Sequence, residues 1–277
     1  MLKQRIVTAL LLLVFVGGPV LLLPESGFVL LAIVVFSVAA WEWAQLAGFN
    51  GSMRRGAYVV VHGVLAIALL WLCGLPDSAN PVVLQMVFTV AGVWWALALL
   101  WVQSYPASAS LWQHAAIRSI MGLLVLLPAL LAFVYMRVAG PYIWLVLYLV
   151  ALVAAADVGA YFAGKAWGVK KMAPRVSPGK SWAGLMGGIS AAMLLAVIVF
   201  AALPIPMASV QWLLISLIVA LSSVLGDLLE SMLKRHCGIK DSSQILPGHG
   251  GVLDRLDGWT AAAPIFALCL LSVGWSP

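Results

Sequence analysis

The chain has 277 residues, of which 64% are hydrophobic and only 9% are charged. A soluble chain carries roughly 25% charged residues, because polar side chains must cover its surface. The 15 basic and 9 acidic side chains here are too few to do so. This composition excludes an ordinary cytosolic enzyme, a disordered chain and a secreted disulfide scaffold, and it indicates a polytopic integral membrane protein.

Nine apolar segments are long enough to cross a membrane, since a transmembrane helix needs about 20 mainly apolar residues. They cover residues 6–23, 28–46, 57–75, 82–102, 119–138, 142–162, 182–203, 211–229 and 259–275. The first follows Lys3 and Arg5, as the apolar part of a signal peptide would. It is longer than the usual apolar part of about 7–15 residues, and no clear cleavage site follows, so we expect it to remain as the first span.

Basic residues are distributed unevenly over the loops between these segments. With the N-terminus in the cytoplasm, 14 of the 15 Lys and Arg residues fall on the cytoplasmic side, and only Arg137 falls on the other. Cytoplasmic loops of membrane proteins carry an excess of Lys and Arg. The bias therefore predicts a cytoplasmic N-terminus. It also favours an odd number of spans, because losing one would reverse the sides of all later loops.

The expected fold is all-α. Lipid admits only helices or closed barrels as spanning structures, and these segments are too long and continuous for barrel strands. We divide the chain into residues 1–138, with five spans, and residues 139–277, with four spans and most of the candidate site residues. The two long polar stretches of the second region, residues 164–181 and 231–258, lie on the cytoplasmic side in this topology.

Two carboxylates stand out within the apolar segments. Glu42 lies between Trp41 and Trp43 near the end of the second segment. It is either an interfacial carboxylate in an aromatic belt or a supporting residue at a functional site. Asp157 lies about two turns before the cytoplasmic end of the sixth segment. A carboxylate in an apolar span indicates function by default, and the alternative for Asp157 is a hydrogen bond to a neighbouring helix.

Ser177, Lys180 and Ser181 precede the seventh segment. The run from Gly179 to Ser181 resembles the end of a Walker A loop, but Pro174 stands where that motif needs a glycine, so we reject a P-loop. What remains is a set of donors and one cation just before a helix N-terminus, a position that favours anions.

A polar stripe ends the eighth segment. Asp227, Glu230, Ser231 and Lys234 recur at offsets of 0, 3, 4 and 7, and so share one helix face. An i,i+4 ion pair would account for Glu230 and Lys234. It would not account for Asp227, which lies within the apolar part.

The segment after this stripe combines acidic, basic and glycine residues. Four aspartates fall within 31 residues, and they are Asp227, Asp241, Asp254 and Asp257. Glycines such as Gly250 and Gly251 let backbone N–H groups approach a phosphate closely. Carboxylates for a hard cation, with Lys and Arg for the remaining phosphate oxygens, predict a Mg²⁺–polyphosphate site.

Two other chemistries are disfavoured by spacing. His236, Cys237 and His249 lack the ligand spacing of a tetrahedral zinc site. A lipase is disfavoured because the chain contains no G-x-S-x-G nucleophile elbow.

Residues 231–257 resemble the signature of the phosphatidate cytidylyltransferase (CDP-diacylglycerol synthase) family, S-x-x-K-R-x4-K-D-x-S-x2-L-P-x-H-G-G-x-x-D-R-x-D. The chain matches it at every specified position. Shorter runs also resemble family segments, namely residues 41–43, 157–161, 173–174 and 177–180. One departure is Ala183, where many relatives carry Glu or Gln, which argues against an essential polar side chain at that position.

The resemblance implies an enzyme that converts CTP and phosphatidate into CDP-diacylglycerol and pyrophosphate. It implies Mg²⁺, alone or with a second cation, at a metal centre on Asp227 and Asp254. It also implies a multi-pass homodimer in the inner cell membrane, with its active site on the cytoplasmic side and no nucleic-acid partner.

The residues and the resemblance together assign expected roles. The catalytic set is Lys234, Arg235, Lys240, Asp241 and Arg255. The substrate-binding set is Ser177, Lys180, Ser181, Ser231, His249, Gly250 and Gly251. Asp157 and Asp257 are expected to support the site.

Three other functions fit the sequence less well. A transporter would place charge near the membrane midplane, often in symmetric halves, whereas the charges here gather at the cytoplasmic ends of the sixth and eighth segments. A CDP-alcohol phosphotransferase needs the motif D-G-x2-A-R-x8-G-x3-D-x3-D, and the residues that follow Asp157 do not match it. A CTP-dependent lipid or polyprenol kinase is the closest alternative, and it would release CDP in place of pyrophosphate.

The topology can be tested by labelling single cysteines in sealed cells. A membrane-impermeant thiol reagent should label a Ser78→Cys variant but not a Ser243→Cys variant, with the parent chain as the background control. Labelling of the Ser243 position from outside would refute the topology.

Overall fold

The computed structural model describes residues 17–138, 143–246, 248 and 250–275. Its helices are α2 (Glu25–Leu46), α3 (Ser52–Leu72), α4 (Pro81–Gln103), α5 (Ala109–Trp112), α6 (Ala115–Val138), α7 (Trp144–Trp167), α8 (Trp182–Ala202), α9 (Ser209–His236) and α10 (Leu253–Ser272). Between α7 and α8, the short strands β1 (Lys171–Ala173) and β2 (Ser177–Ser181) pair antiparallel. The expected all-α membrane fold is thus confirmed, with a small hairpin added in the polar stretch after α7.

Seven of these helices, α2, α3, α4, α6, α7, α8 and α9, are long and apolar enough to cross a membrane. The expected span at residues 259–275 corresponds to α10, which is not among the seven and carries Asp254, Arg255 and Asp257 at its start. Most of the first expected span, residues 6–23, lies outside the described residues. The number nine therefore stays a prediction.

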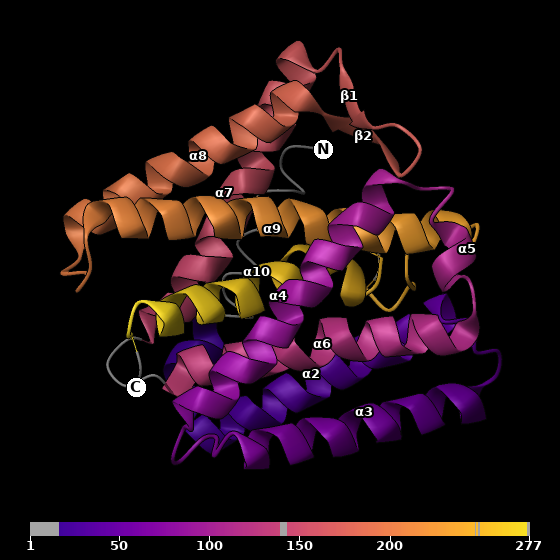
Figure 1. The fold of residues 1–277 in the computed structure, drawn as a ribbon, viewed down its shortest axis with the longest axis horizontal. Coiled ribbons are helices and arrows are strands. Elements are labelled where there is room, and N and C mark those ends of the chain that lie inside the picture. Colours follow the sequence, from indigo (N-terminus) through magenta and orange to yellow (C-terminus); the bar gives the residue numbers. More distant parts are fainter. Residues whose placement is uncertain (1–16, 139–142, 247, 249, 276–277) are drawn as a thin grey trace.

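The helices form a bundle in which α9 and α10 lie between α2, α3 and α6 on one side and α8 on the other, and α4 and α7 cross these layers (Figure 1). Helix α10 contacts α4, α6, α7 and α9. The C-terminal ends of α2, α4 and α9 lie toward the same end of the bundle, at the right of the view. Residues from both halves of the sequence therefore meet there.

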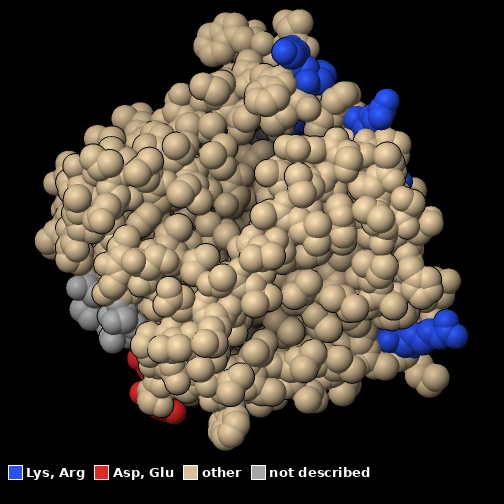
Figure 2. Space-filling model, viewed as in Figure 1, with Lys and Arg blue, Asp and Glu red and all other residues tan. Residues whose placement is uncertain are grey.

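Charge differs between the ends of the bundle. In the view of Figure 2, Lys and Arg side chains gather at the upper and right edges, and Asp and Glu show at the lower left. The broad face between them shows neither kind. An uncharged band between two charged ends is the arrangement that a bilayer requires of a spanning protein.

Helix α9 is longer than the span expected at residues 211–229. With 28 residues and a rise of about 1.5 Å per residue, it exceeds a hydrocarbon core of about 30 Å. Its last two turns therefore carry Glu230, Ser231 and Lys234 beyond the apolar part as ordered helix. Since α9 ends at His236 and α10 begins at Leu253, residues 231–236 and 253–258 of the expected 231–258 loop are helical.

Close backbone packing fixes α7 against α8. A Cβ atom added at Gly187 would clash with the Cβ of Ala163, and it would lie 2.9 Å from the carbonyl oxygen of Gly159. One added at Gly188 would lie 2.7 Å from the carbonyl oxygen of Ala156. Small residues at such crossings let two helices in lipid approach closely. This crossing sets where Asp157 on α7 lies relative to Lys180, just before α8.

A Gly187→Ala variant should destabilise the α7–α8 crossing, because the atoms that its methyl group meets are rigid. We expect a cost of about 1–3 kcal/mol, the usual scale of overpacking, seen as a lower melting temperature in detergent. Gly63→Ala in α3 is the matched control, since a Cβ there meets nothing within 4 Å. Equal melting temperatures for the two variants would contradict the packing argument.

Candidate active site

A polar cavity of about 240 Å³ lies where α7, β2, α9 and α10 meet. Its lining residues are Asp157, Lys180, Ser223, Val224, Asp227, Asp254, Arg255, Asp257 and Gly258. Six of the residues expected at the site from the sequence are thereby brought together, although they come from stretches up to 100 residues apart (157 to 257). The cavity holds four carboxylates and two cations, a combination that suits a cation together with phosphate groups.

Asp227 is paired with the cation that precedes α8. The Lys180 Nζ lies 2.7 Å from the Asp227 Oδ2, and it also donates to the Val224 carbonyl oxygen at 3.4 Å. The Ser231 hydroxyl, one turn along α9, donates to the Asp227 Oδ1 at 3.0 Å. The Asp227 end of the stripe that the sequence indicated on α9 therefore faces Lys180 of the β-hairpin and the cavity.

Asp254, in the first turn of α10, accepts contacts from four donor groups. The Lys234 Nζ lies 2.6 Å from its Oδ1, and the same ammonium lies 3.1 Å from Glu230 Oε1. Its Oδ2 accepts hydrogen bonds from the Ser242 N–H and Oγ, both at 2.9 Å, and from the Gly251 N–H at 2.7 Å. The orientation of Asp254 is therefore set by α9 and by the segment before α10 together.

The two carboxyl groups at the start of α10 differ in their pKa, although both precede its apolar part. Burial alone would raise the pKa of Asp254, but hydrogen bonds from the Lys234 side chain and from the Gly251 N–H hold it well below its usual range. Burial raises the pKa of Asp257, and the neighbouring charge of Asp227 raises it further. Repulsion of this kind between carboxylates favours binding of a cation among them.

Other expected site residues lie outside this cavity. The Arg235 Nε donates to the Val176 carbonyl oxygen at 3.3 Å, which fastens the β-hairpin to α9. The Ser181 hydroxyl accepts the Gly184 N–H at 3.1 Å and so caps α8. Lys240 and Asp241 are exposed, and neither side chain makes an ion pair within the described part of the chain.

Two further expected substrate-binding residues, Ser177 and Gly250, also lie away from the cavity lining. Ser177 lies at the start of β2, opposite Ala173. The Gly250 carbonyl oxygen accepts the Leu246 N–H at 2.9 Å, which closes the turn before α10. His249 lies outside the described residues.

Glu42 is a residue whose role the sequence left open. It is 1% exposed, so it is not an interfacial side chain. Its two carboxyl oxygens accept hydrogen bonds from Ser242, Ser243, Val252 and Leu253, all in the segment that leads into α10. The sequence signal was a lone carboxylate in an apolar segment, but partners about 200 residues away could not be read from it.

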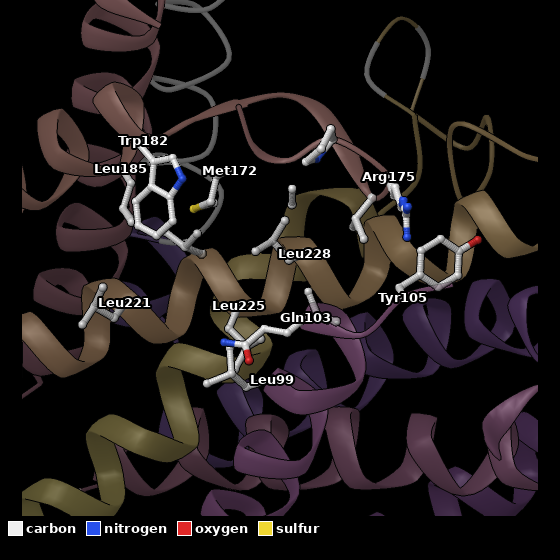
Figure 3. Close-up of a pocket in the computed structure, with 15 residues that line it drawn as sticks. Leu99, Gln103, Tyr105, Met172, Arg175, Trp182, Leu185, Leu221, Leu225 and Leu228 are labelled. Atoms are coloured by element: carbon white, nitrogen blue, oxygen red, sulfur yellow. The ribbon is translucent and has the colours of Figure 1, made fainter. Parts of the chain in front are cut away.

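An apolar groove of about 380 Å³ adjoins the polar cavity (Figure 3). Leu221, Leu225 and Leu228 of α9 form one wall, and Trp182 and Leu185 of α8 lie at one end. Tyr105 and Arg175 lie at the other end. Val224 lines both spaces, so the groove and the cavity are neighbours.

The donor set is compatible with Mg²⁺. In the described ranges no group of three or more His, Cys, Asp or Glu side chains could hold a metal by itself. Mg²⁺ usually needs only one or two protein carboxylates, because it keeps several waters and takes further oxygens from substrate phosphates. Asp227 and Asp254, which share the cavity, meet that requirement.

Comparison with known proteins identifies the family of this chain. A sequence model of the Cytidylyltransferase family matches residues 3–273. This chain belongs to the cytidylyltransferase family. A relative from Pseudomonas aeruginosa named phosphatidate cytidylyltransferase is 47% identical, with 99% of each chain covered. Proteins of the same name from Haemophilus influenzae and Bacillus subtilis are 39% and 32% identical, covering 96% and 98% of this chain and 98% of each relative. The family resemblance of residues 231–257 is confirmed.

In this cytidylyltransferase, replacing Lys234 by Met should destabilise the fold. The change leaves Glu230 and Asp254, whose side chains are 3% and 5% exposed, without their cation. Removing one partner of a buried ion pair typically costs about 3–5 kcal/mol. Lys240→Met removes the same charge at an exposed position and is the matched control. Melting temperatures in detergent measure the difference, and a Lys234→Met variant as stable as the control would show that the pair contributes nothing.

Proposed function

We propose that this cytidylyltransferase transfers the cytidylyl group of CTP to phosphatidate, giving CDP-diacylglycerol and pyrophosphate. One observation carries the proposal beyond family membership: a cavity lined by carboxylates and cations shares Val224 with an apolar groove. A polyphosphate nucleotide suits the cavity and the acyl chains of a lipid suit the groove. Neither a kinase nor a transporter is favoured by a particular contact in this structure.

In the proposed reaction, a phosphate oxygen of phosphatidate attacks the α-phosphorus of CTP. A new P–O bond forms there, the bond between the α-phosphorus and its bridging oxygen breaks, and pyrophosphate leaves with the electron pair. The attacking phosphate monoester is already ionised at neutral pH, so no strong general base is required. The task of the protein is to position both substrates and to neutralise charge, as in phosphoryl transfer generally.

The cavity residues fit these tasks. Lys180 and Arg255 face the cavity and would contact phosphate oxygens. Asp227 and Asp254 would hold Mg²⁺, which supplies charge neutralisation of the phosphates when bound. Lys180 now pairs with Asp227, and it would be free to bind phosphate once that carboxylate had another cation. Asp157 and Asp257 complete the acidic lining.

The groove suits the acyl chains of the lipid. Its walls come from α4, α8, α9 and the β-hairpin, and its α9 wall consists of leucines. Because Val224 borders both spaces, a lipid with its tails in the groove could present its phosphate to the cavity. We propose that phosphatidate enters from the bilayer while CTP enters from water.

We further propose that the protein lies in the inner cell membrane as a homodimer, with the cavity on the cytoplasmic side. The supporting observations are the distribution of Lys and Arg along the sequence and their gathering at the end of the bundle where α9 finishes (Figures 1 and 2). The dimer rests on the family resemblance alone.

The purified protein in detergent, given phosphatidate, Mg²⁺ and CTP labelled at the α-phosphorus, should place the label in CDP-diacylglycerol. CTP labelled at the γ-phosphorus should give labelled pyrophosphate. A kinase would instead place the γ label on the lipid and release CDP, and that result would overturn the proposal.

A magnesium titration tests the metal ligands. Asp227→Asn and Asp254→Asn should each lower the rate by at least about 100-fold, the scale of one lost electrostatic contact at a transition state. Each should also raise the Mg²⁺ concentration needed for half-maximal rate. Asp241→Asn, at an exposed position outside the cavity lining, is the comparison. If Asp241→Asn alone changed the rate and the metal requirement, the ligands would be wrongly assigned.

A further inference from the structure

We propose that Glu42 is a positioning residue for this reaction, holding the segment that orients Asp254 without itself touching substrate. The proposal rests on the function proposed above. Glu42 lies on α2, in the N-terminal half of the chain, and it is not among the residues that line the polar cavity. Its effect on the cavity must therefore pass through the groups that it contacts.

Each carboxyl oxygen of Glu42 accepts one side-chain and one backbone hydrogen bond. Oε1 accepts the Ser243 hydroxyl at 2.5 Å and the Val252 N–H at 3.0 Å. Oε2 accepts the Ser242 hydroxyl at 3.2 Å and the Leu253 N–H at 2.6 Å. A buried carboxyl group is costly unless it is hydrogen-bonded, so these four donors are what stabilises Glu42 at 1% exposure.

Glu42 also acts as the cap of α10. Val252, the residue before that helix, offers no side-chain cap of its own. The first N–H groups of a helix lack partners within the helix and carry a partial positive charge. Glu42 supplies the missing acceptors from a different helix. It thereby fixes where α10 begins, and Asp254 lies in that first turn.

The same short segment contacts Asp254. The Ser242 Oγ lies within hydrogen-bonding distance of both Glu42 Oε2, at 3.2 Å, and Asp254 Oδ2, at 2.9 Å. The Ser242 and Gly251 N–H groups also donate to Asp254 Oδ2, which leaves Asp254 Oδ1 directed at Lys234. A shift of this segment away from Glu42 would therefore move three of the donors that orient Asp254.

The space around Gly251 shows how closely the segment fits Glu42. A Cβ atom at Gly251 would lie 2.6 and 2.7 Å from the two carboxyl oxygens of Glu42, and it would clash with the Ser242 hydroxyl. The backbone at Gly251 is thus in direct contact with the carboxyl group. So close a fit defines one position for the segment, which is what a group supporting a metal ligand or phosphate site must provide.

The test compares Glu42→Gln with Trp43→Phe. Gln keeps the size of the side chain but points an NH₂ group at donors. Trp43 is the next residue on α2 and is equally buried, and its indole N–H donates to the Arg118 carbonyl oxygen at 2.8 Å, away from the segment. Trp43→Phe therefore disturbs the same helix end while the hydrogen bond that it removes leads to Arg118 and not to the segment before α10. Glu42→Asp keeps the charge and serves as the conservative variant.

Two measurements are made on the detergent-purified full chain. The first is hydrogen–deuterium exchange of peptides covering residues 239–256, which needs no substrate. The second is kcat, the KM for CTP and the Mg²⁺ concentration at half-maximal rate, each per folded molecule. We expect Glu42→Gln to speed exchange in this segment, to lower kcat by about 10–100-fold and to raise the Mg²⁺ requirement. Glu42→Asp should give values between those of Glu42→Gln and the parent chain. Trp43→Phe should leave the exchange rate, kcat and the Mg²⁺ requirement unchanged.

Each other outcome overturns the inference in a recognisable way. Faster exchange with unchanged kcat and Mg²⁺ requirement would make Glu42 a stability residue only. A lower kcat with unchanged exchange would mean that Glu42 does not act through this segment. The same changes in Trp43→Phe would show a general effect of disturbing α2. If the parent chain made no CDP-diacylglycerol, the proposed function would fail, and the exchange result would still decide whether Glu42 holds the segment.

Discussion

The buried ion pair between Lys234 and Asp254 joins the end of α9 to the start of α10, and the rest of the site is arranged around it. An ion pair out of water is favourable only when its remaining hydrogen-bonding groups also find partners. Here Glu230 shares the ammonium, and Ser242 and Gly251 donate to the carboxylate. These contacts hold the start of α10 against the end of α9, and Asp254 and Arg255 line the cavity from there.

The bilayer explains why this junction of α9 and α10 lies at one end of the bundle. Charged groups are costly within lipid, so the carboxylates and cations collect where α9 extends past the apolar part and where α10 begins. The apolar groove continues from the same place along the leucines of α9. A water-borne phosphate compound and a lipid can therefore meet at this end without either entering an unsuitable solvent.

The N-terminal helices contribute more than an anchor in the membrane. Glu42 on α2 accepts hydrogen bonds from the segment before α10, and Arg118 at the start of α6 donates to the Leu46 carbonyl oxygen and to the Cys237 Sγ, at 2.7 and 3.4 Å. Both contacts join the first half of the chain to the end of α9 and the start of α10. The cavity is formed by the second half but held in place from the first.

The sequence alone determined the membrane class and the positions of seven apolar helices, and it named six of the residues that line the cavity, because these follow from composition, segment length and a continuous motif. Helical spacing also placed Glu230 and Lys234 in contact, since an i,i+4 pair is local. Only the tertiary structure decided that Lys180 pairs with Asp227, that Arg235 fastens the β-hairpin, and that Glu42 caps α10. Those partners lie 47, 59 and about 210 residues apart, and contacts at such separations depend on how helices pack, which no local pattern of residues specifies.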